Sequence, residues 1–317
     1  MKKYLLLTTV ALLVSGNVLA EETELPTSGG CGTGCAWFYD ESTKTIKISG
    51  NETGTGVMEN YTYTYSGRYI ISAPWAGYRD TAENVMIEGV SNIGNAAFLG
   101  FKIKNVEMDD NVTRLGTDSF AETFSLEKIK LSGRLEQVQS SAFQNIGQNV
   151  EIGIQNFVLP ESLTYLADLK AINVDTLVMP SEFSVNYIRK ELFSNGVESY
   201  RERVSVKTMY CTGEQMAACS AALQDARIDI EPTRYEKTSD GVLVYDKKGN
   251  AVSKYKDINA LGAKEVAETY KYDSAGRLVG IFDGNGQRTW GKKIYTVEEA
   301  MEATKDGDKF HVYLTYK

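Results

Sequence analysis

Histidine and proline are scarce in this chain of 317 residues, which has one histidine, five prolines and four cysteines. A single histidine argues against zinc sites and acyl-transfer sites, which recruit this residue repeatedly. P-loop, dinucleotide-binding and G-x-S-x-G phrases are also absent. The net charge of −8 argues against a nucleic-acid partner, because such a partner requires a basic surface. We therefore predict no cofactor, no metal, no catalytic residue and no nucleic-acid partner.

Beyond the N-terminus there is no apolar run long enough to span a bilayer. Residues 1–20 have the pattern of a secretory signal peptide: Lys2 and Lys3, an apolar run over 4–14, and small residues before a cleavage point after Ala20. An N-terminal membrane anchor is the alternative. We expect a secreted, periplasmic or cell-surface protein with no transmembrane segment after cleavage.

The four cysteines are an even number, as expected of disulfides in an oxidising compartment. Cys31 and Cys35 flank a Gly-Thr-Gly turn, and Cys211 and Cys219 flank the start of a predicted helix. We favour these two local pairs, although the sequence leaves the other two connectivities open. Zinc is a weaker hypothesis, because the spacings differ from those of zinc sites.

What the chain does contain is a phrase written three times over residues 84–143. Its copies end at Phe98, Phe120 and Phe143, which are 22 and 23 positions apart. A period in this range, with apolar residues at alternating positions, is typical of leucine-rich-repeat solenoids. One coil cannot bury its apolar side alone, so stacked coils and end caps are expected to stabilise the fold.

Within each copy, a strand is expected to alternate between inward and outward side chains. Val85 and Ile87 would point inward, Met86 and Glu88 outward, and Gly94 would allow close approach of the backbone. Function must then depend on outward residues. The candidate binding face consists of Met86, Glu88, Glu107, Asp109, Lys130 and Ser132. An ordinary solvated sheet face is the alternative interpretation of these six.

The residues before the repeats carry a family resemblance. Over about residues 31–180 the chain resembles BspA-like bacterial leucine-rich-repeat proteins. The resemblance lies in the order of Cys31, Trp37, the strand 45–49, Pro74-Trp75, Tyr78 and the first repeat. The resemblance implies a β-rich α+β repeat fold: a right-handed solenoid with an N-terminal β cap. It also implies adhesion or protein–protein contact at a host or bacterial surface. The residues between Met58 and Trp75 depart from the family pattern, which predicts an extra hairpin or loop.

The predicted organisation has four parts: signal peptide 1–20, leader and β cap 21–83, solenoid 84–231, and a small β-rich module 232–317. In the cap, 36–40 and 45–49 are expected to pair as a hairpin. Later coils are centred near residues 159 and 179, with an extra strand predicted at 150–152. Four further elements are expected after these coils. They are a short helix over 185–194, a strand over 204–210, a helix over 214–226 and a strand at 228–230. Thr212 and Gln215 form a capping-box pattern at the start of the helix over 214–226.

After Pro232 the phrase Y-D-x-x-G appears at Tyr245 and Tyr272, and 282–286 echoes its turn. It resembles the YD repeats of secreted bacterial proteins. Asp-Gly and Asn-Gly steps favour tight hairpin turns. A helix over 296–305 and a strand over 310–316, which carries His311, are expected to complete this module.

We favour an exported, non-enzymatic recognition or adhesion protein. A carbohydrate-binding surface built from Tyr61, Tyr63, Tyr65 and Trp75 is the first alternative, since aromatic rings suit sugar or protein contact. A secreted hydrolase is the second; it would need carboxylates such as those of 109–110 or 298–299 to converge across a cleft. A spacer role in the cell envelope is the third.

Overall fold

The computed structural model describes residues 25–51, 53, 55–151, 153–193, 204–261 and 266–291. The predicted signal peptide 1–20, the helix 296–305, the strand 310–316 with His311, and the carboxylates of 298–299 lie outside the described residues. Two compact units are present, divided between Tyr235 and Glu236. Among the described residues, no helix is long and apolar enough to cross a membrane.

The first unit begins with a four-stranded cap, of which the sequence predicted one hairpin. Strands β1 (Ser28–Thr33), β2 (Cys35–Asp40) and β3 (Thr45–Ser49) pair antiparallel in succession, and β4 (Gly56–Met58) pairs with the other edge of β1. The predicted hairpin is thus confirmed as β2 and β3. The Cys31–Cys35 disulfide closes the turn between β1 and β2, as predicted.

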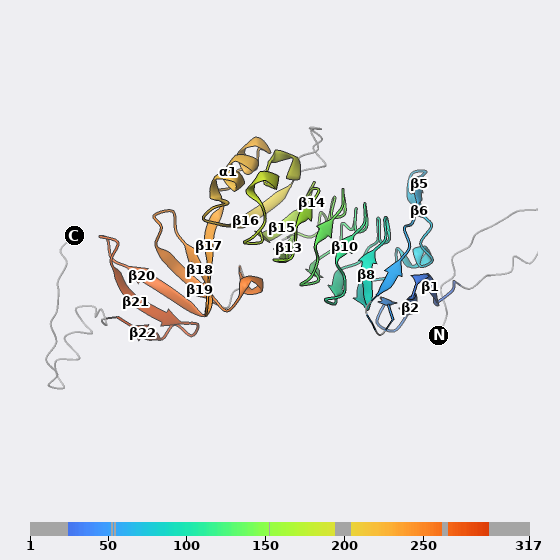
Figure 1. Cartoon of the computed structure of the whole chain (residues 1–317), viewed down its shortest axis with the longest axis horizontal. Helices are drawn as coiled ribbons and strands as arrows, with labels where there is room; N and C mark the ends of the chain where they lie inside the picture. The colour runs from blue at the N-terminus through green and yellow to red at the C-terminus, as the bar shows by residue number, and fades with distance from the viewer. Residues whose placement is uncertain are drawn as a thin grey trace, which may run out of the picture. The chain divides into compact units, whose positions relative to one another are not determined.

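Two parallel ladders extend from this cap. The first ladder runs from β3 through β7 (Asn84–Glu88), β9 (Asn105–Met108) and β11 (Lys128–Lys130). The second ladder runs from β4 through β8 (Val90–Ile93), β10 (Arg114–Leu115), β12 (Gln137–Val138) and β14 (Tyr165–Leu166). The cap joins both ladders into one curled sheet of eleven strands (Figure 1).

The repeat phrase explains this arrangement. Val85 and Ile87 are buried, with 2% and 0% of their surface exposed, whereas Glu88 is exposed. Gly94 lies where a Cβ atom would come within 1.7 Å of the carbonyl oxygen of Glu59, so no side chain fits there. These placements confirm the inward and outward assignment within the first copy.

The third side of each coil is a turn that carries the repeated phenylalanine. Trp75 of the cap stacks on Phe98 at 5.5 Å between ring centroids, Phe98 on Phe120 at 5.2 Å, and Phe120 on Phe143 at 6.4 Å. All four rings are fully buried. This aromatic column (Trp75, Phe98, Phe120 and Phe143) is therefore a continuous core element that joins the cap to the first three coils.

Two residues before each phenylalanine, the backbone takes a left-handed conformation: φ is 52° at Ala96, 55° at Asp118 and 57° at Ser141. Such values are uncommon for residues other than glycine. Backbone hydrogen bonds between neighbouring coils hold the turns together, for example from the Phe98 N–H to the Ser119 carbonyl oxygen at 2.8 Å.

The later coils widen into longer parallel strands: β13 (Ile154–Val158), β15 (Asn173–Val178), β16 (Ser205–Thr212) and β17 (Thr233–Thr238). The predicted helix over 214–226 is α1 (Met216–Asp225), and the predicted Cys211–Cys219 disulfide ties it to β16. The Gln215 side chain accepts from the Thr212 N–H at 3.1 Å, which is one half of the predicted capping box. It also donates to the carbonyl oxygens of Pro180 and Phe183.

Three predictions in this part are wrong. Residues 185–193 form two 3-10 turns, η2 (Val185–Tyr187) and η3 (Lys190–Leu192), and no α-helix, although Ile188, Leu192 and Phe193 are buried as their spacing suggested. Residues 228–230 are not a strand; the chain continues instead to β17. Val150 and Glu151, the described residues of the predicted extra strand, are not in a strand either.

The predicted insert between Met58 and Trp75 is a hairpin of β5 (Tyr63–Tyr65) and β6 (Tyr69–Ile71), followed by the 3-10 turn η1 (Ala76–Tyr78). The Tyr63 hydroxyl donates to Asp118 at 3.1 Å and the Tyr69 hydroxyl to Glu122 at 2.9 Å. The hairpin is thus anchored to the turn that carries Phe120.

The second unit contains an antiparallel sheet of β18 (Gly241–Tyr245), β19 (Ala251–Tyr255), β20 (Glu268–Tyr272), β21 (Leu278–Asp283) and β22 (Arg288–Trp290). The 3-10 turn η4 (Ile258–Ala260) follows β19. Asp246, Asp273 and Asp283 each begin a hairpin turn in which the carboxylate accepts two backbone N–H groups. The glycine three residues later has positive φ each time, so the predicted tight turns are confirmed.

Candidate binding face

The outward side chains of the first ladder lie in rows that cross its strands. The pairing register places Lys47 of β3, Met86 of β7, Glu107 of β9 and Lys130 of β11 side by side in one row. A second row, one alternation away, holds Asn84, Asn105 and Lys128 and ends at Thr45, whose side chain is buried. We call these eight residues the ladder face. Beneath them, Val85, Val106 and Ile129 point into the core.

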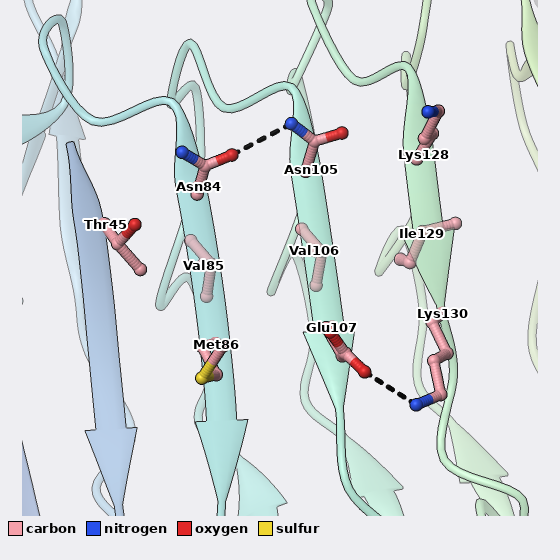
Figure 2. Close-up of a pocket in the computed structure, with 10 residues that line it drawn as sticks. All are labelled: Thr45, Asn84, Val85, Met86, Asn105, Val106, Glu107, Lys128, Ile129 and Lys130. Atoms are coloured by element: carbon pink, nitrogen blue, oxygen red, sulfur yellow. Dashed lines mark hydrogen bonds and ion pairs between the residues drawn. The ribbon is translucent and has the colours of Figure 1, made fainter. Parts of the chain in front are cut away.

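Three of the six predicted site residues belong to the ladder face: Met86, Glu107 and Lys130. Figure 2 shows the ion pair between Glu107 and Lys130, whose Nζ and Oε1 atoms are 2.6 Å apart. Hydrogen bonding and attraction to Glu107 raise the pKa of the Lys130 ammonium above its ordinary value. Both side chains are more than half exposed, so this pair stabilises the fold by less than about 1 kcal/mol. Glu88 is exposed one alternation further along β7.

Glu88 lies outside the ladder face but is exposed, whereas the other two predicted residues, Ser132 and Asp109, are not exposed. Ser132 is fully buried, and its hydroxyl oxygen accepts the Arg134 N–H at 3.1 Å, so its assignment as an outward residue is wrong. The chain turns immediately after β11, and the strand alternation no longer holds at that position. Asp109 is half-buried and accepts the Gly89 N–H at 2.8 Å and the Asn111 N–H at 3.0 Å. It stabilises a turn between coils.

The ladder face is slightly hollowed. Its eight residues, with Lys47 excepted, line a shallow depression of about 470 Å³ together with Val85, Val106 and Ile129 (Figure 2). Asn105 donates from Nδ2 to the Asn84 Oδ1 at 2.9 Å, which orders the short polar row. Within the described part of the chain, the Lys128 ammonium forms no ion pair. The depression therefore offers amides, a thioether and an unpaired cation for contact with another molecule.

Five residues of the ladder face were not predicted from the sequence: Lys47, and the second row of Thr45, Asn84, Asn105 and Lys128. Each residue of the second row directly precedes the first inward apolar residue of its strand. In a strand, the residues on both sides of an inward residue point outward, so the same alternation predicts this second row.

The aromatic platform predicted from Tyr61, Tyr63, Tyr65 and Trp75 does not form. Trp75 is 0% exposed, and its indole N–H donates to the Ala97 carbonyl oxygen at 2.9 Å. Tyr61 is also buried, and its hydroxyl donates to the Cys31 carbonyl oxygen. Tyr63 and Tyr65 are 43% and 67% exposed and both pack against Tyr69. The prediction is wrong because the strand starts only at Tyr63, so alternation cannot be extended back to Tyr61.

Of the carboxylates considered for hydrolysis, Asp109 and Asp110 have structural partners. Asp110 accepts the Gly133 N–H at 2.7 Å, just as Asp109 accepts that of Gly89. Each carboxylate thus caps a turn of a neighbouring coil. Among the described residues, no group of three or more His, Cys, Asp or Glu side chains is arranged to hold a metal ion. The geometry of the ladder face suits binding by surface contact.

Comparison with family models identifies the type of repeat that forms the coils. Six copies of the model described as the BspA type leucine rich repeat region match residues 78–199. This part of the chain is a BspA-type leucine-rich repeat region. The match includes the first three coils with Phe98, Phe120 and Phe143 of the aromatic column, and it continues through β13, β15 and η3. Leucine-rich repeats of this type are a protein-interaction fold.

Solved structures of several bacterial leucine-rich repeat proteins are similar to this chain. A leucine-rich repeat protein from Eubacterium ventriosum is 17% identical, with a TM-score of 0.43, over 68% of this chain and 48% of that one. This chain thus spans about half the length of that protein. A leucine-rich repeat protein from T. pallidum is 15% identical, with a TM-score of 0.25, over 62% of this chain and 94% of that one.

A leucine-rich cell surface protein from Faecalibacterium prausnitzii is 12% identical, with a TM-score of 0.22, over 72% of this chain and 61% of that one. No curated protein matches the sequence.

Proposed function

We propose that this protein is an exported recognition protein that binds a protein partner through the ladder face of its BspA-type repeats. The observation that carries the proposal is the alternation of side chains along each strand between the core and the outer face. The inward residues are buried in the core, and the exposed Glu107–Lys130 ion pair of the outward side contributes little to stability. A surface of this kind suits recognition, because its side chains can change without disturbing the scaffold.

The partner is expected to be a protein on a host or bacterial surface. The ladder face mixes amides, Met86 and charges of both signs, and this favours a contact that includes hydrogen bonds and apolar area. The cell-surface description of the Faecalibacterium prausnitzii protein is consistent with adhesion as the wider role.

Capture of a partner from surface extracts by the chain starting at Glu21 tests this assignment. Glu107→Lys places two cations side by side and is expected to abolish capture. The double variant Glu107→Lys/Lys130→Glu restores an ion pair with reversed polarity, so it should fold like the native chain and still fail to capture. Gln137→Lys, on the exposed side of β12 in the second ladder, is the control and should capture normally. Normal capture by the double variant would show that the partner binds elsewhere.

Export is proposed on two grounds: the pattern of residues 1–20, and two disulfides, which persist in oxidising compartments. N-terminal sequencing of protein recovered outside the cytoplasm should begin at Glu21. Recovery of the intact N-terminus Met1 would favour the membrane-anchor alternative.

A further inference from the structure

The sheet of the second unit has an aromatic side chain lying over a glycine. In the register of β20 and β21, Lys271 faces Gly280, and Thr269 faces Phe282. A Cβ atom added to Gly280 would lie 3.0 Å from the Phe282 Cε2 atom. The phenyl ring therefore covers the space that the glycine leaves open. This is a known way to fill the gap at a strand glycine.

Two cations gather on this same ring. The Lys271 ammonium lies 4.5 Å from the Phe282 centroid, and the Arg288 guanidinium carbon lies 5.1 Å from it. They come from β20 and β22, the two strands that flank β21. Each contact with the ring is favourable by about 0.5–1 kcal/mol, but a ring carries no net charge that could neutralise two like charges.

Neither cation has a carboxylate partner among the described residues. Other cations of this unit are paired: Arg277 with Asp273 at 2.7 Å, and Lys254 with Asp240. By contrast, the Nη1 nitrogen of Arg288 is shielded from solvent and has no hydrogen-bond acceptor within the part of the chain that the structure describes. An unsatisfied donor is unusual in a folded protein, and an ion or ligand atom that displaced the side chain covering this nitrogen would satisfy it.

We infer that Lys271 and Arg288 form a binding site for an oxyanion: a carboxylate, sulfate or phosphate group. An oxyanion bound by both side chains would accept charge-assisted hydrogen bonds from each, and its negative charge would offset their positive charges. Phe282 would hold the two cations in place beneath it. The site belongs to the second unit, where no role has been assigned, and it is independent of the ladder face.

The test uses the full chain from Glu21, labelled with nitrogen-15. Sodium sulfate, phosphate and acetate are titrated at constant ionic strength against sodium chloride, and the amide resonances of Gly280 and its strand neighbours are followed. Saturable shifts are expected with at least one oxyanion and none with chloride. The ion that saturates at the lowest concentration identifies the chemical group.

Lys271→Gln and Arg288→Gln should each weaken this binding by roughly tenfold, since each removes one charged donor. Arg277→Gln is the matched control, because it removes one positive charge from the same sheet but from a side chain already paired with Asp273. It should change the affinity less than twofold. Thermal unfolding of each variant shows whether the sheet is intact.

Two results would overturn the inference. One is identical shifts with all three oxyanions and with chloride, which would mean an adventitious ion only. The other is equal weakening by Arg277→Gln and Arg288→Gln, which would mean attraction to the overall charge of the sheet.

Discussion

Ser119 and Ser132 are both fully buried, yet only the Ser132 hydroxyl has a hydrogen-bond partner among the described residues. The Ser119 hydroxyl has none among the described residues, and the matching positions of the coils on either side are Ala97 and Ala142. A buried hydroxyl without a partner costs about 1–3 kcal/mol. Ser119→Ala is therefore expected to raise the free energy of unfolding by about 1 kcal/mol, as measured by urea denaturation.

Ser132→Ala is the control for this prediction. It removes the acceptor of the Arg134 N–H and should lower the free energy of unfolding by about 1 kcal/mol. A loss of stability in both variants would contradict the view that Ser119 is unsatisfied.

Asp118 is a second residue whose burial lowers the stability of the folded state, because its carboxylate is partly removed from water. Burial raises the pKa of this carboxyl above its ordinary value near 3.8, and Asp168 adds to the effect, whereas the Tyr63 hydroxyl and Lys170 oppose it. The folded state binds the Asp118 proton more tightly than the unfolded chain does. The contribution of this group to the free energy of unfolding is therefore greatest below the ordinary pKa, and it is lost as the pH rises through the folded-state pKa.

Asp118→Asn should consequently stabilise the protein at pH 7, and the gain should shrink toward zero below pH 3.8. An asparagine also tolerates the left-handed backbone, with φ of 55°, and can accept the Tyr63 hydroxyl hydrogen. Urea unfolding of both chains at pH 7 and at pH 3.5 measures the difference. A gain that is the same at both values would rule out titration as its cause.

Among the elements, the aromatic column joins the cap to the repeats. Phe120 is central, with near-parallel rings on both sides at 5.2 and 6.4 Å. Phe120→Leu should lower the free energy of unfolding by about 1–3 kcal/mol, because it removes both ring contacts and leaves unfilled volume. Guanidinium denaturation checks the value. Phe124→Leu is the control: this ring is 36% exposed, so the loss there should be below about 1 kcal/mol.

The strands of the first ladder and both disulfides were predictable because their signals are local. Alternation around Val85 and Ile87 and the short spacing of Cys31 and Cys35 are visible within a few residues. The second ladder was not predictable, because β10, β12 and β14 are two residues long and exist only through bonds between coils. No propensity argument applies to so short a segment.

The same reasoning explains the errors at the site. Met86, Glu107 and Lys130 were found because they lie inside regular strands, where side chains alternate. Ser132 was misplaced because the alternation ends with β11, and the position where a strand ends depends on its neighbours in space. The periodic spacing of Ile188, Leu192 and Phe193 correctly indicated burial, but two 3-10 turns satisfy it as well as a helix does.

At the scale of the whole molecule, the end of the first unit can be tested. The sequence suggested a boundary after Glu231, whereas the compact units divide after Tyr235. Tyr235 is 0% exposed, and its hydroxyl donates to the Met179 carbonyl oxygen at 2.7 Å. Residues 233–235 also extend the parallel pairing from β16 into β17. These contacts assign Tyr235 to the core of the first unit.

A chain ending at Thr238 should therefore unfold cooperatively, and a chain ending at Glu231 should be less stable by about 3 kcal/mol, since it loses one fully buried aromatic side chain and a strand pairing. Both chains start at Glu21 and are compared by thermal and urea denaturation. Tyr235→Phe in the longer chain separates the two contributions: it removes only the hydrogen bond to Met179 and should lower the free energy of unfolding by about 1 kcal/mol. Equal stability of the two truncated chains would place the boundary at Glu231 and make β17 part of the second unit.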